Sequence, residues 1–254
     1  MYILDKIMNI LSIISKIPEK RWCEFLNKFK NYKIYIIVDD NDFDLTEFIS
    51  TYKNIVFMKI DDVKCKTKGY IKGQHSEDNK LVNGWDKALY YFAVENTNYD
   101  FIWFMEDDVF FYSEDTLVQI DNKYKTEDLI SNIHYPKTDT NRVNSWSWDD
   151  VNIAYNEPLY SGSMNSVRVS KRMVNCINDY VVKNKQLFYF ESLFPTVAIK
   201  NSLKYVTPKE LVNVDIKAKY ERKDINKINI YHPEDNLSMQ LYYRNHLIPH
   251  LIIQ

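Results

Sequence analysis

The chain has 254 residues, of which 45% are hydrophobic and 27% charged, and this composition is typical of a globular protein that buries one substantial core. Its formal net charge at pH 7 is -2, and its lysines form no basic stripe, which excludes a general electrostatic attraction to nucleic acid. The uncharged run in the apolar N-terminal stretch is too short to cross a bilayer, so we also expect no integral membrane segment.

The cysteines favour a reducing compartment. Cys23, Cys65 and Cys176 lie far apart without metal-ligand spacing, and their odd number cannot make a complete disulfide set. The N-terminal stretch lacks a basic leader and a small-residue cleavage site, which disfavours export. We therefore expect reduced cysteines that serve as packing residues, and a cytoplasmic location.

The first quarter of the chain predicts alternating strands and helices. Residues 9–17 are rich in β-branched side chains and predict a strand. Pro18 fits the first position of a following helix. The apolar residues of that helix recur at helical spacing, namely Trp22, Phe25, Leu26 and Phe29. Two further predicted strands, 33–38 and 54–60, lie on either side of a short helix within residues 43–52.

Acidic residues follow these strands. Asp39 follows the second and Asp61 follows the third, and a helix expected from Asn83 to about residue 95 leads into a fourth apolar run, 101–105, which ends in Glu106, Asp107 and Asp108. This alternation predicts the α/β class, with a Rossmann-like, mostly parallel sheet flanked by helices in a three-layer α/β/α arrangement. Because ligands bind outside the carboxyl ends of such strands, we expect Asp39, Asp61 and the acidic cluster to share one rim.

The cluster Glu106-Asp107-Asp108 carries the strongest chemical signal. Three adjacent carboxylates at the end of a buried strand repel one another unless a cation lies between them. Magnesium and manganese prefer oxygen ligands and bind one or two protein carboxylates together with substrate phosphates. The cluster therefore predicts a metal-phosphate site, and the alternative is a solvated acidic loop that caps the strand.

Three later segments offer weaker signals. Residues 63–82 hold several lysines and two glycines without periodicity, and they predict a loop near the rim. Residues 131–157 also lack a clear period. They contain Trp146, Trp148, Asp149 and Asp150, which form either an acceptor-binding wall or aromatic packing over the sheet. Gly162 permits close approach of the backbone to a ligand, or a tight turn.

The last third predicts two more helices and a short strand. Ser170 fits the cap of a helix with an apolar face. Glu191 follows the aromatic run 188–190. It precedes a predicted helix in which Pro195 is tolerable only within the first turn. The apolar run 228–231 leads into His232, which is followed by proline.

The order of these parts resembles the GT-A class of nucleotide-sugar-dependent glycosyltransferases, particularly the family-2-like, inverting branch. The resemblance covers most of the chain as a single GT-A domain. It implies a nucleotide-binding half of about residues 1–112 and an acceptor-binding half of about residues 113–254. It rests on the strand that ends in Asp39-Asp40, on GWDKALYYFAVENTNYDFIWFMEDDVFF (84–111), on YSGSMNSVRVSKRM (160–173), on FYFESLFP and on YHP.

The resemblance implies roles for individual residues. Glu106-Asp107-Asp108 occupies the position of the DxD motif, which implies that Asp108 is the direct ligand of Mn²⁺ or Mg²⁺. Glu106 would contact the donor ribose, or the metal through water. Asp39 resembles the acidic residue that contacts the nucleotide, and Lys87 stands where a basic residue often lies near it. His232 resembles a C-terminal histidine that completes the metal shell, and imidazole coordination favours manganese.

Glu191 resembles the acidic residue that acts as general base in inverting members. An acceptor hydroxyl must lose a proton as the diphosphate leaves, so a positioned carboxylate is also expected on chemical grounds. Asp149 and Asp150 are rival candidates. The implied partners are a UDP- or GDP-sugar donor and a glycan or protein acceptor.

Two departures and two alternatives accompany this resemblance. The first acidic position is Glu106 where the family has aspartate, and the residues after His232 are acidic where a basic residue is often found. A sugar-phosphate nucleotidylyltransferase would share the sheet and the metal, but residues 9–20 lack the glycine-rich phosphate loop that it needs. A non-catalytic sugar- or nucleotide-binding scaffold with the same fold is the second alternative.

Overall fold

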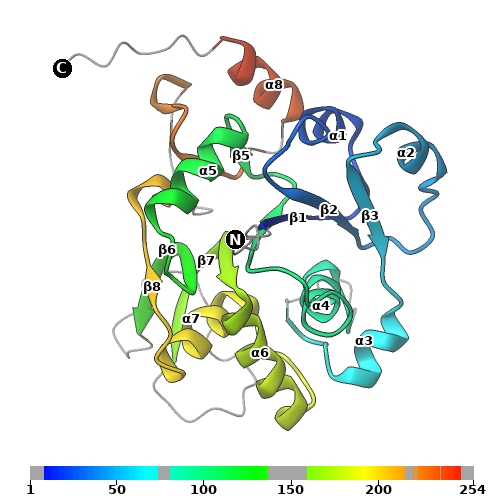
Figure 1. The fold of residues 1–254 in the computed structure, drawn as a ribbon, viewed down its shortest axis with the longest axis vertical. Coiled ribbons are helices and arrows are strands. Elements are labelled where there is room, and N and C mark those ends of the chain that lie inside the picture. The colour runs from blue at the N-terminus through cyan, green and yellow to red at the C-terminus, as the bar shows by residue number, and fades with distance from the viewer. Residues whose placement is uncertain are drawn as a thin grey trace, which may run out of the picture.

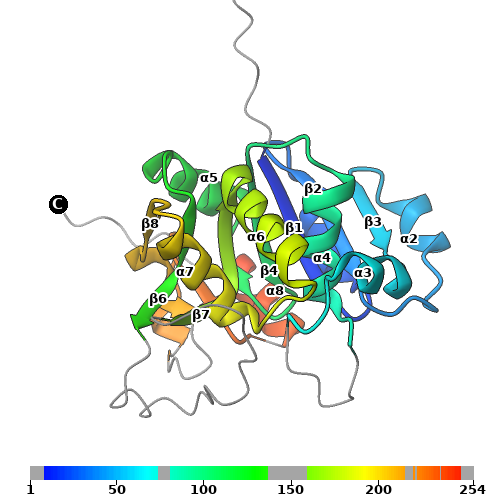
Figure 2. The same ribbon diagram turned by 90° about the horizontal axis from the view of Figure 1, so that it is seen from below.

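A computed structural model describes residues 9–73, 81–136, 159–214, 220, 222–234 and 236–246. Within these residues it shows a central seven-stranded sheet with helices on both faces, which confirms the α/β class (Figures 1 and 2). In the part of the chain that it describes, no helix is both long and apolar enough to cross a membrane. Cys23, Cys65 and Cys176 are free thiols, and the first two are buried.

The strands of the central sheet are β1 (Asn9–Ser15), β2 (Lys33–Val38), β3 (Ile55–Lys59), β4 (Phe101–Glu106), β6 (Leu129–Pro136), β7 (Tyr160–Ser170) and β8 (Tyr205–Val206). A small second sheet contains β5 (Phe110–Phe111), β9 (Asn213–Val214) and β10 (Ile230–His232). The helices are α1 (Lys20–Leu26), α2 (Thr46–Thr51), α3 (Asp62–Lys68), α4 (Gly84–Tyr90), α5 (Glu114–Lys123), α6 (Lys171–Asn184), α7 (Phe190–Lys200) and α8 (Leu237–His246). A π-helical turn, Tyr91–Glu95, continues α4.

The order of the strands creates a crevice between β1 and β4. The central sheet runs β3-β2-β1-β4-β7-β6-β8. The chain therefore proceeds outward from β1 to β3 and then returns to β4 on the other side of β1. Strands β1 to β4 are parallel, whereas β7 is antiparallel to β4. Ligands bind α/β sheets at the carboxyl ends of strands where the order reverses, so this topology selects the ends of β1 and β4.

Two hydrophobic cores lie on opposite faces of the central sheet. On one face, Trp85 of α4, Ile177 of α6 and Val197 of α7 are buried in one cluster. On the other face, Trp22 of α1, Phe48 of α2 and Leu117 of α5 belong to a second cluster. Figure 1 shows the corresponding separation of the helices, with α1, α2 and α5 on one side of the strands and α4, α6 and α7 on the other. Burial on both faces explains why the strands are nearly continuous apolar runs.

Three local expectations were wrong. Pro18 was expected at the first position of a helix, but α1 begins at Lys20 and has Glu19 as its N-cap. Residues 63–82 were predicted as a loop, but helix α3 occupies Asp62–Lys68, because Asp61 caps its N-terminus and Gly69 adopts a left-handed conformation with φ of 86° at its C-terminus. Pro195 was expected within a first turn, but it lies inside α7. Since proline has no amide hydrogen, it cannot donate the helical hydrogen bond to the carbonyl group of Glu191, four residues earlier.

Asp128 predicts an acid-sensitive contribution to stability. Its carboxylate accepts hydrogen bonds from Ser170 Oγ at 2.7 Å, Lys204 N at 3.0 Å and Arg172 Nε at 3.1 Å. Burial raises the pKa of Asp128, but these hydrogen bonds outweigh that effect and leave its pKa below the usual value. A lowered pKa adds stability that is present above the unfolded-state pKa and is lost as the pH falls through the folded-state pKa.

We therefore expect Asp128→Asn to lower the free energy of unfolding at neutral pH, and the difference from wild type to shrink as the pH falls below about 4. Urea denaturation between about pH 6 and pH 3 measures this difference. A difference that stays constant over this range would contradict the assigned pKa shift.

Candidate metal site at the end of strand β4

The acidic cluster lies at the crevice between β1 and β4. Glu106 is the last residue of β4 and pairs with Ile14 near the end of β1. Asp107 and Asp108 form the turn that follows, which is closed by a hydrogen bond from Val109 N to Glu106 O at 3.2 Å. The chain then enters β5. The rim position expected for these carboxylates is the position at which the sheet order reverses.

Pairing of distant strands brings His232 to this turn. Strand β10 runs antiparallel to β5, with Ile230 opposite Phe111 and Tyr231 opposite Phe110. Beyond His232, the backbone N–H of Glu234 donates to the carbonyl oxygen of Asp108 at 2.7 Å. The small sheet thereby places an imidazole from the end of the chain against carboxylates from its middle.

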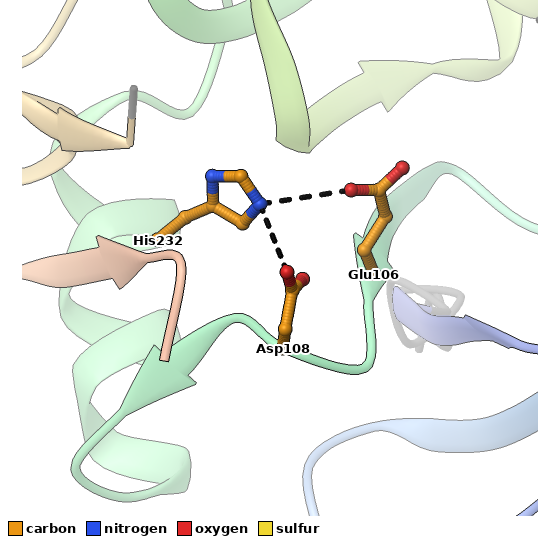
Figure 3. A group of neighbouring side chains, drawn as sticks. All are labelled: Glu106, Asp108 and His232. Atoms are coloured by element: carbon orange, nitrogen blue, oxygen red, sulfur yellow. Dashed lines mark ion pairs between the residues drawn. The ribbon is translucent and has the colours of Figure 1, made fainter. Parts of the chain in front are cut away.

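The imidazole faces two of the three carboxylates. His232 Nε2 lies 3.2 Å from Asp108 Oδ2 and 3.7 Å from Glu106 Oε2 (Figure 3). One ligand atom from each of the three residues lies within 4.8 Å of the other two. Asp108 Oδ1 and His232 Nδ1 are buried and have no hydrogen-bond partner among the described residues. Two carboxylates and an imidazole are a suitable donor set for a divalent transition metal, so these residues fit the expected ion.

The electrostatics of the group also favour a cation. Burial raises the pKa of Glu106, and hydrogen bonds from Asn165 and Trp85 oppose part of that shift. Burial alone would lower the pKa of His232, but Asp108, Glu106 and Glu191 raise it above its usual value. The Glu106 shift reflects chiefly burial of the carboxylate, and the His232 shift reflects nearby negative charge, and a bound cation would relieve both.

Two side chains hold the Glu106 carboxylate. The indole Nε1 of Trp85 donates to Oε1 at 2.9 Å, and Asn165 Nδ2 donates to Oε2 at 2.6 Å. Neither Trp85 nor Asn165 was expected in the site. No sequence signal marks Asn165, because only the antiparallel pairing of β7 with β4 brings it beside Glu106. Such hydrogen bonds orient a ligand before the metal arrives.

We expect Asn165→Leu to weaken Mn²⁺ affinity about 10- to 100-fold, because the Glu106 carboxylate loses one of the donors that orient it. Mn²⁺ titration followed by electron paramagnetic resonance measures the change. Asn175→Leu, at an exposed position of α6, is the matched control and should bind Mn²⁺ as the wild type does. Equal affinities for all three proteins would contradict a role for Asn165 in orienting Glu106.

Asp107 points toward β1. Ser15 Oγ donates a hydrogen bond to Asp107 Oδ2, and the indole Nε1 of Trp22 donates to the backbone carbonyl oxygen of Asp107 at 2.6 Å. Burial raises the pKa of Asp107, and the Ser15 hydrogen bond opposes this shift. These contacts fasten the acidic turn to β1 and α1. Contact of Asp107 with a substrate stays a prediction.

Of the residues expected to bind the nucleotide, Lys87 and Asp39 contact each other. Lys87 Nζ lies 2.9 Å from Asp39 Oδ1 and 3.2 Å from Asp62 Oδ1, and the lysine side chain is only 2% exposed. The buried ammonium group of Lys87 therefore neutralises the negative charge of the carboxylates that follow β2 and β3. Asp61 accepts a hydrogen bond from Val63 N at 2.6 Å as the cap of α3. Contacts of Asp39, Asp61 and Lys87 with a nucleotide stay predictions.

Glu191 lies on the side of the site formed by α7. It is in the first turn of this helix and contributes to the raised pKa of His232. Burial raises the pKa of Tyr189, and Glu191 and Glu106 add to that shift. The ring of Phe190 stacks on Trp85 with centroids 4.3 Å apart. The structure thus brings Glu191 into the electrostatic range of the metal candidate.

Other expected residues are placed differently or are not described. Gly162 lies within strand β7 and not in the tight turn that was one of its two expected roles. Trp146, Trp148, Asp149 and Asp150 lie outside the described residues. Their expected roles on the acceptor side stay predictions.

Comparison with known proteins identifies the fold. No protein-family model matches the sequence, and no curated protein matches it. The galactosyltransferase LgtC, solved in complex with donor and acceptor sugar analogues, aligns with a TM-score of 0.51 and 8% identity over 96% of this chain and 98% of that chain. An active-site mutant of LgtC gives a TM-score of 0.50 and 9% identity over the same shares, 96% and 98%. Mouse xyloside xylosyltransferase 1 in its apo form gives 0.47 and 7% identity over 91% of this chain and 98% of that chain.

The structural alignment with LgtC, at 8% identity, shows a shared fold and no shared activity. The two LgtC alignments extend over almost the whole of this chain and of the LgtC chain. The resemblance to GT-A enzymes is confirmed for the fold, whereas membership of the family-2-like branch stays a prediction. This chain has the GT-A fold of nucleotide-sugar-dependent glycosyltransferases.

Proposed function

We propose that this protein is a metal-dependent glycosyltransferase of the hexosyltransferase type, which moves a sugar from a nucleoside-diphosphate sugar to a hydroxyl group of a glycan or protein acceptor. The group formed by Glu106, Asp108 and His232 carries the proposal, because it lies where a GT-A sheet binds its ligand. LgtC, which has the same fold, was solved with donor and acceptor sugar analogues.

Asp108 and His232 would bind the ion directly, and Glu106 would bind it directly or through water. The imidazole nitrogen favours Mn²⁺ over Mg²⁺, which prefers an all-oxygen shell. When bound, the ion neutralises charge on the donor diphosphate as it leaves. Asp39, held by Lys87 at the end of β2, would contact the UDP or GDP part of the donor. In this proposal about residues 1–112 bind the nucleotide, and about residues 113–254 bind the acceptor and supply His232.

Glu191 is the proposed general base. Its carboxylate would accept the proton of the acceptor hydroxyl as the new glycosidic bond forms, which corresponds to inversion at the anomeric carbon. Its position in the first turn of α7, near the group formed by Glu106, Asp108 and His232, supports this role, because a general base must lie close to the reacting sugar. NMR analysis of the product anomer tests the stereochemistry. Retention at the anomeric carbon would remove Glu191 as an inverting base and would leave the metal site untouched.

A screen of nucleotide sugars with Mn²⁺ tests the proposal. We expect at least one UDP- or GDP-sugar to release free nucleoside diphosphate, and the release to stop in excess chelator. Thermal-shift titration with UDP, GDP and Mn²⁺ separates an enzyme from the alternatives. A scaffold would release no nucleotide from any donor, and a nucleotidylyltransferase would form a nucleotide sugar from a nucleoside triphosphate and a sugar phosphate. Either result would reject glycosyl transfer.

A further inference from the structure

A cavity of about 250 Å³ lies between α1 and α8, outside the candidate metal site. The two helices lie side by side (Figure 1), and Arg21 Nη1 donates to Ser238 Oγ at 2.6 Å between them. The apolar part of the lining comes from Trp22, Phe25, Tyr112, Leu237 and Leu241. Three cationic side chains also line it, Arg21, Lys28 and Arg244, against one carboxylate, Glu24.

Arg244 is the unusual member of this lining. Its guanidinium carbon lies 3.8 Å from the ring centroid of Phe25, 5.0 Å from that of Phe110 and 5.2 Å from that of Trp22. Its Nη2 donates to the carbonyl oxygen of Phe111 and to Gln240 Oε1, each at 3.2 Å. Its Nε is buried and has no hydrogen-bond partner among the described residues.

No described carboxylate forms an ion pair with Arg244, including Glu24 in the same lining. Burial lowers the pKa of Arg244 to about 9, so the guanidinium keeps its charge at neutral pH. A guanidinium that is held among aromatic rings without a described counter-ion is poorly solvated, and cation–π contacts offset only part of that cost. An anion in the adjacent cavity would supply the partner that no described carboxylate provides.

We propose that this cavity binds a small organic carboxylate with a flat apolar body, whose carboxylate pairs with Arg244 and whose body packs against Phe25, Trp22 and Leu241. Three cations against one carboxylate give the cavity the charge that such a ligand complements. Its aromatic and aliphatic lining complements the apolar body. The inference concerns a site separate from the proposed sugar transfer and does not depend on it.

The cavity also adjoins the acidic turn. Trp22 donates its indole hydrogen to the carbonyl oxygen of Asp107, and Arg244 donates to the carbonyl oxygen of Phe111. Both side chains therefore contact the ligand site on one side and the segment that carries Asp108 on the other. The indole N–H of Trp22, held by a hydrogen bond at 2.6 Å, is a direct spectroscopic reporter of occupancy.

Benzoate titration followed by the indole N–H signals in ¹⁵N-correlated NMR spectra tests the site. The Trp22 signal is assigned by its absence in Trp22→Phe. We expect this signal to shift saturably with benzoate. Benzyl alcohol, which has the same shape without the charge, should bind at least about tenfold more weakly because it cannot pair with the guanidinium. No saturable shift with benzoate, or equal binding of the two probes, would overturn the proposal.

Two variants locate the binding. Arg244→Gln removes the cation and should abolish the shift. Leu241→Glu places a negative charge at the cavity on a side chain that is 46% exposed, so it should weaken benzoate binding at least about tenfold without disturbing the fold. Val182→Glu, at a position of α6 that is 57% exposed, is the matched control and should bind as wild type.

If Arg244→Gln fails to fold, Leu241→Glu still decides the test. Wild-type affinity for benzoate in Leu241→Glu would overturn the proposal. Phosphatidylglycerol vesicles form the last arm, because an anionic lipid headgroup is another source of negative charge. Vesicle binding without any benzoate-induced shift of the Trp22 signal would overturn the assignment to a small carboxylate.

Discussion

Asp108→Ala is expected to abolish Mn²⁺-dependent release of nucleoside diphosphate from the donor sugar while the protein stays folded. Asp108 Oδ2 is the carboxylate oxygen nearest to His232 Nε2, at 3.2 Å, and Oδ1 has no partner among the described residues. Its removal deletes a proposed metal ligand. The loss should therefore exceed the roughly 100-fold limit typical of residues that only orient a ligand.

The fold should survive because the backbone contact of Asp108 with the segment that follows β10 does not require the carboxylate. The carbonyl oxygen of Asp108 accepts the hydrogen bond from Glu234 N, and alanine keeps that carbonyl. Removal of a carboxylate beside Glu106 also relieves like-charge repulsion. Donor turnover and Mn²⁺ affinity are measured together with the thermal unfolding midpoint. Asp179→Ala, at an exposed position of α6, is the control. Full donor turnover in Asp108→Ala would reject the metal site.

Glu191→Gln is expected to lower kcat about 10²- to 10⁴-fold while nucleotide and Mn²⁺ affinities stay close to wild type. Glutamine keeps the size of the side chain but cannot accept the proton of the acceptor hydroxyl. Glu191 is not one of the three grouped ligand residues, so donor binding should persist. Turnover under saturating donor and acceptor, with calorimetric titration of UDP or GDP and Mn²⁺, separates the two effects.

A control substitution in the same residue type is Glu127→Gln. Glu127 lies just before β6. Leu129 of β6 pairs with Val169, which pairs with Ile102 near the start of β4, so Glu127 lies at the end of the sheet opposite Glu106. The Glu127→Gln substitution should therefore leave kcat unchanged. Unchanged kcat in Glu191→Gln would remove Glu191 from the mechanism and transfer the role of base to Asp149 or Asp150.

The fold class was predictable because its signals are local. The runs 33–38 and 101–105 are almost entirely apolar, as expected for strands that are covered by helices on both faces. Helices with one apolar stripe lie between such runs. The acidic end of β4 was also predictable from the sequence, since three carboxylates at the end of a buried strand need either solvent or a cation. Asp61, by contrast, was expected on the rim, and the structure also uses it as the cap of α3, a role that an Asp-Asp pair does not distinguish.

What the sequence by itself determined is therefore the α/β class and the position of the acidic cluster at a strand end, whereas the divalent ion expected there stays a prediction. Only the tertiary structure decided that His232 lies 3.2 Å from Asp108, that Asn165 and Trp85 hold Glu106, and that Lys87 is buried against Asp39. Hydrophobic periodicity and strand ends are properties of neighbouring residues. The candidate metal site instead joins residues more than a hundred positions apart, and the pairing of β10 with β5 that joins them depends on packing across the whole chain.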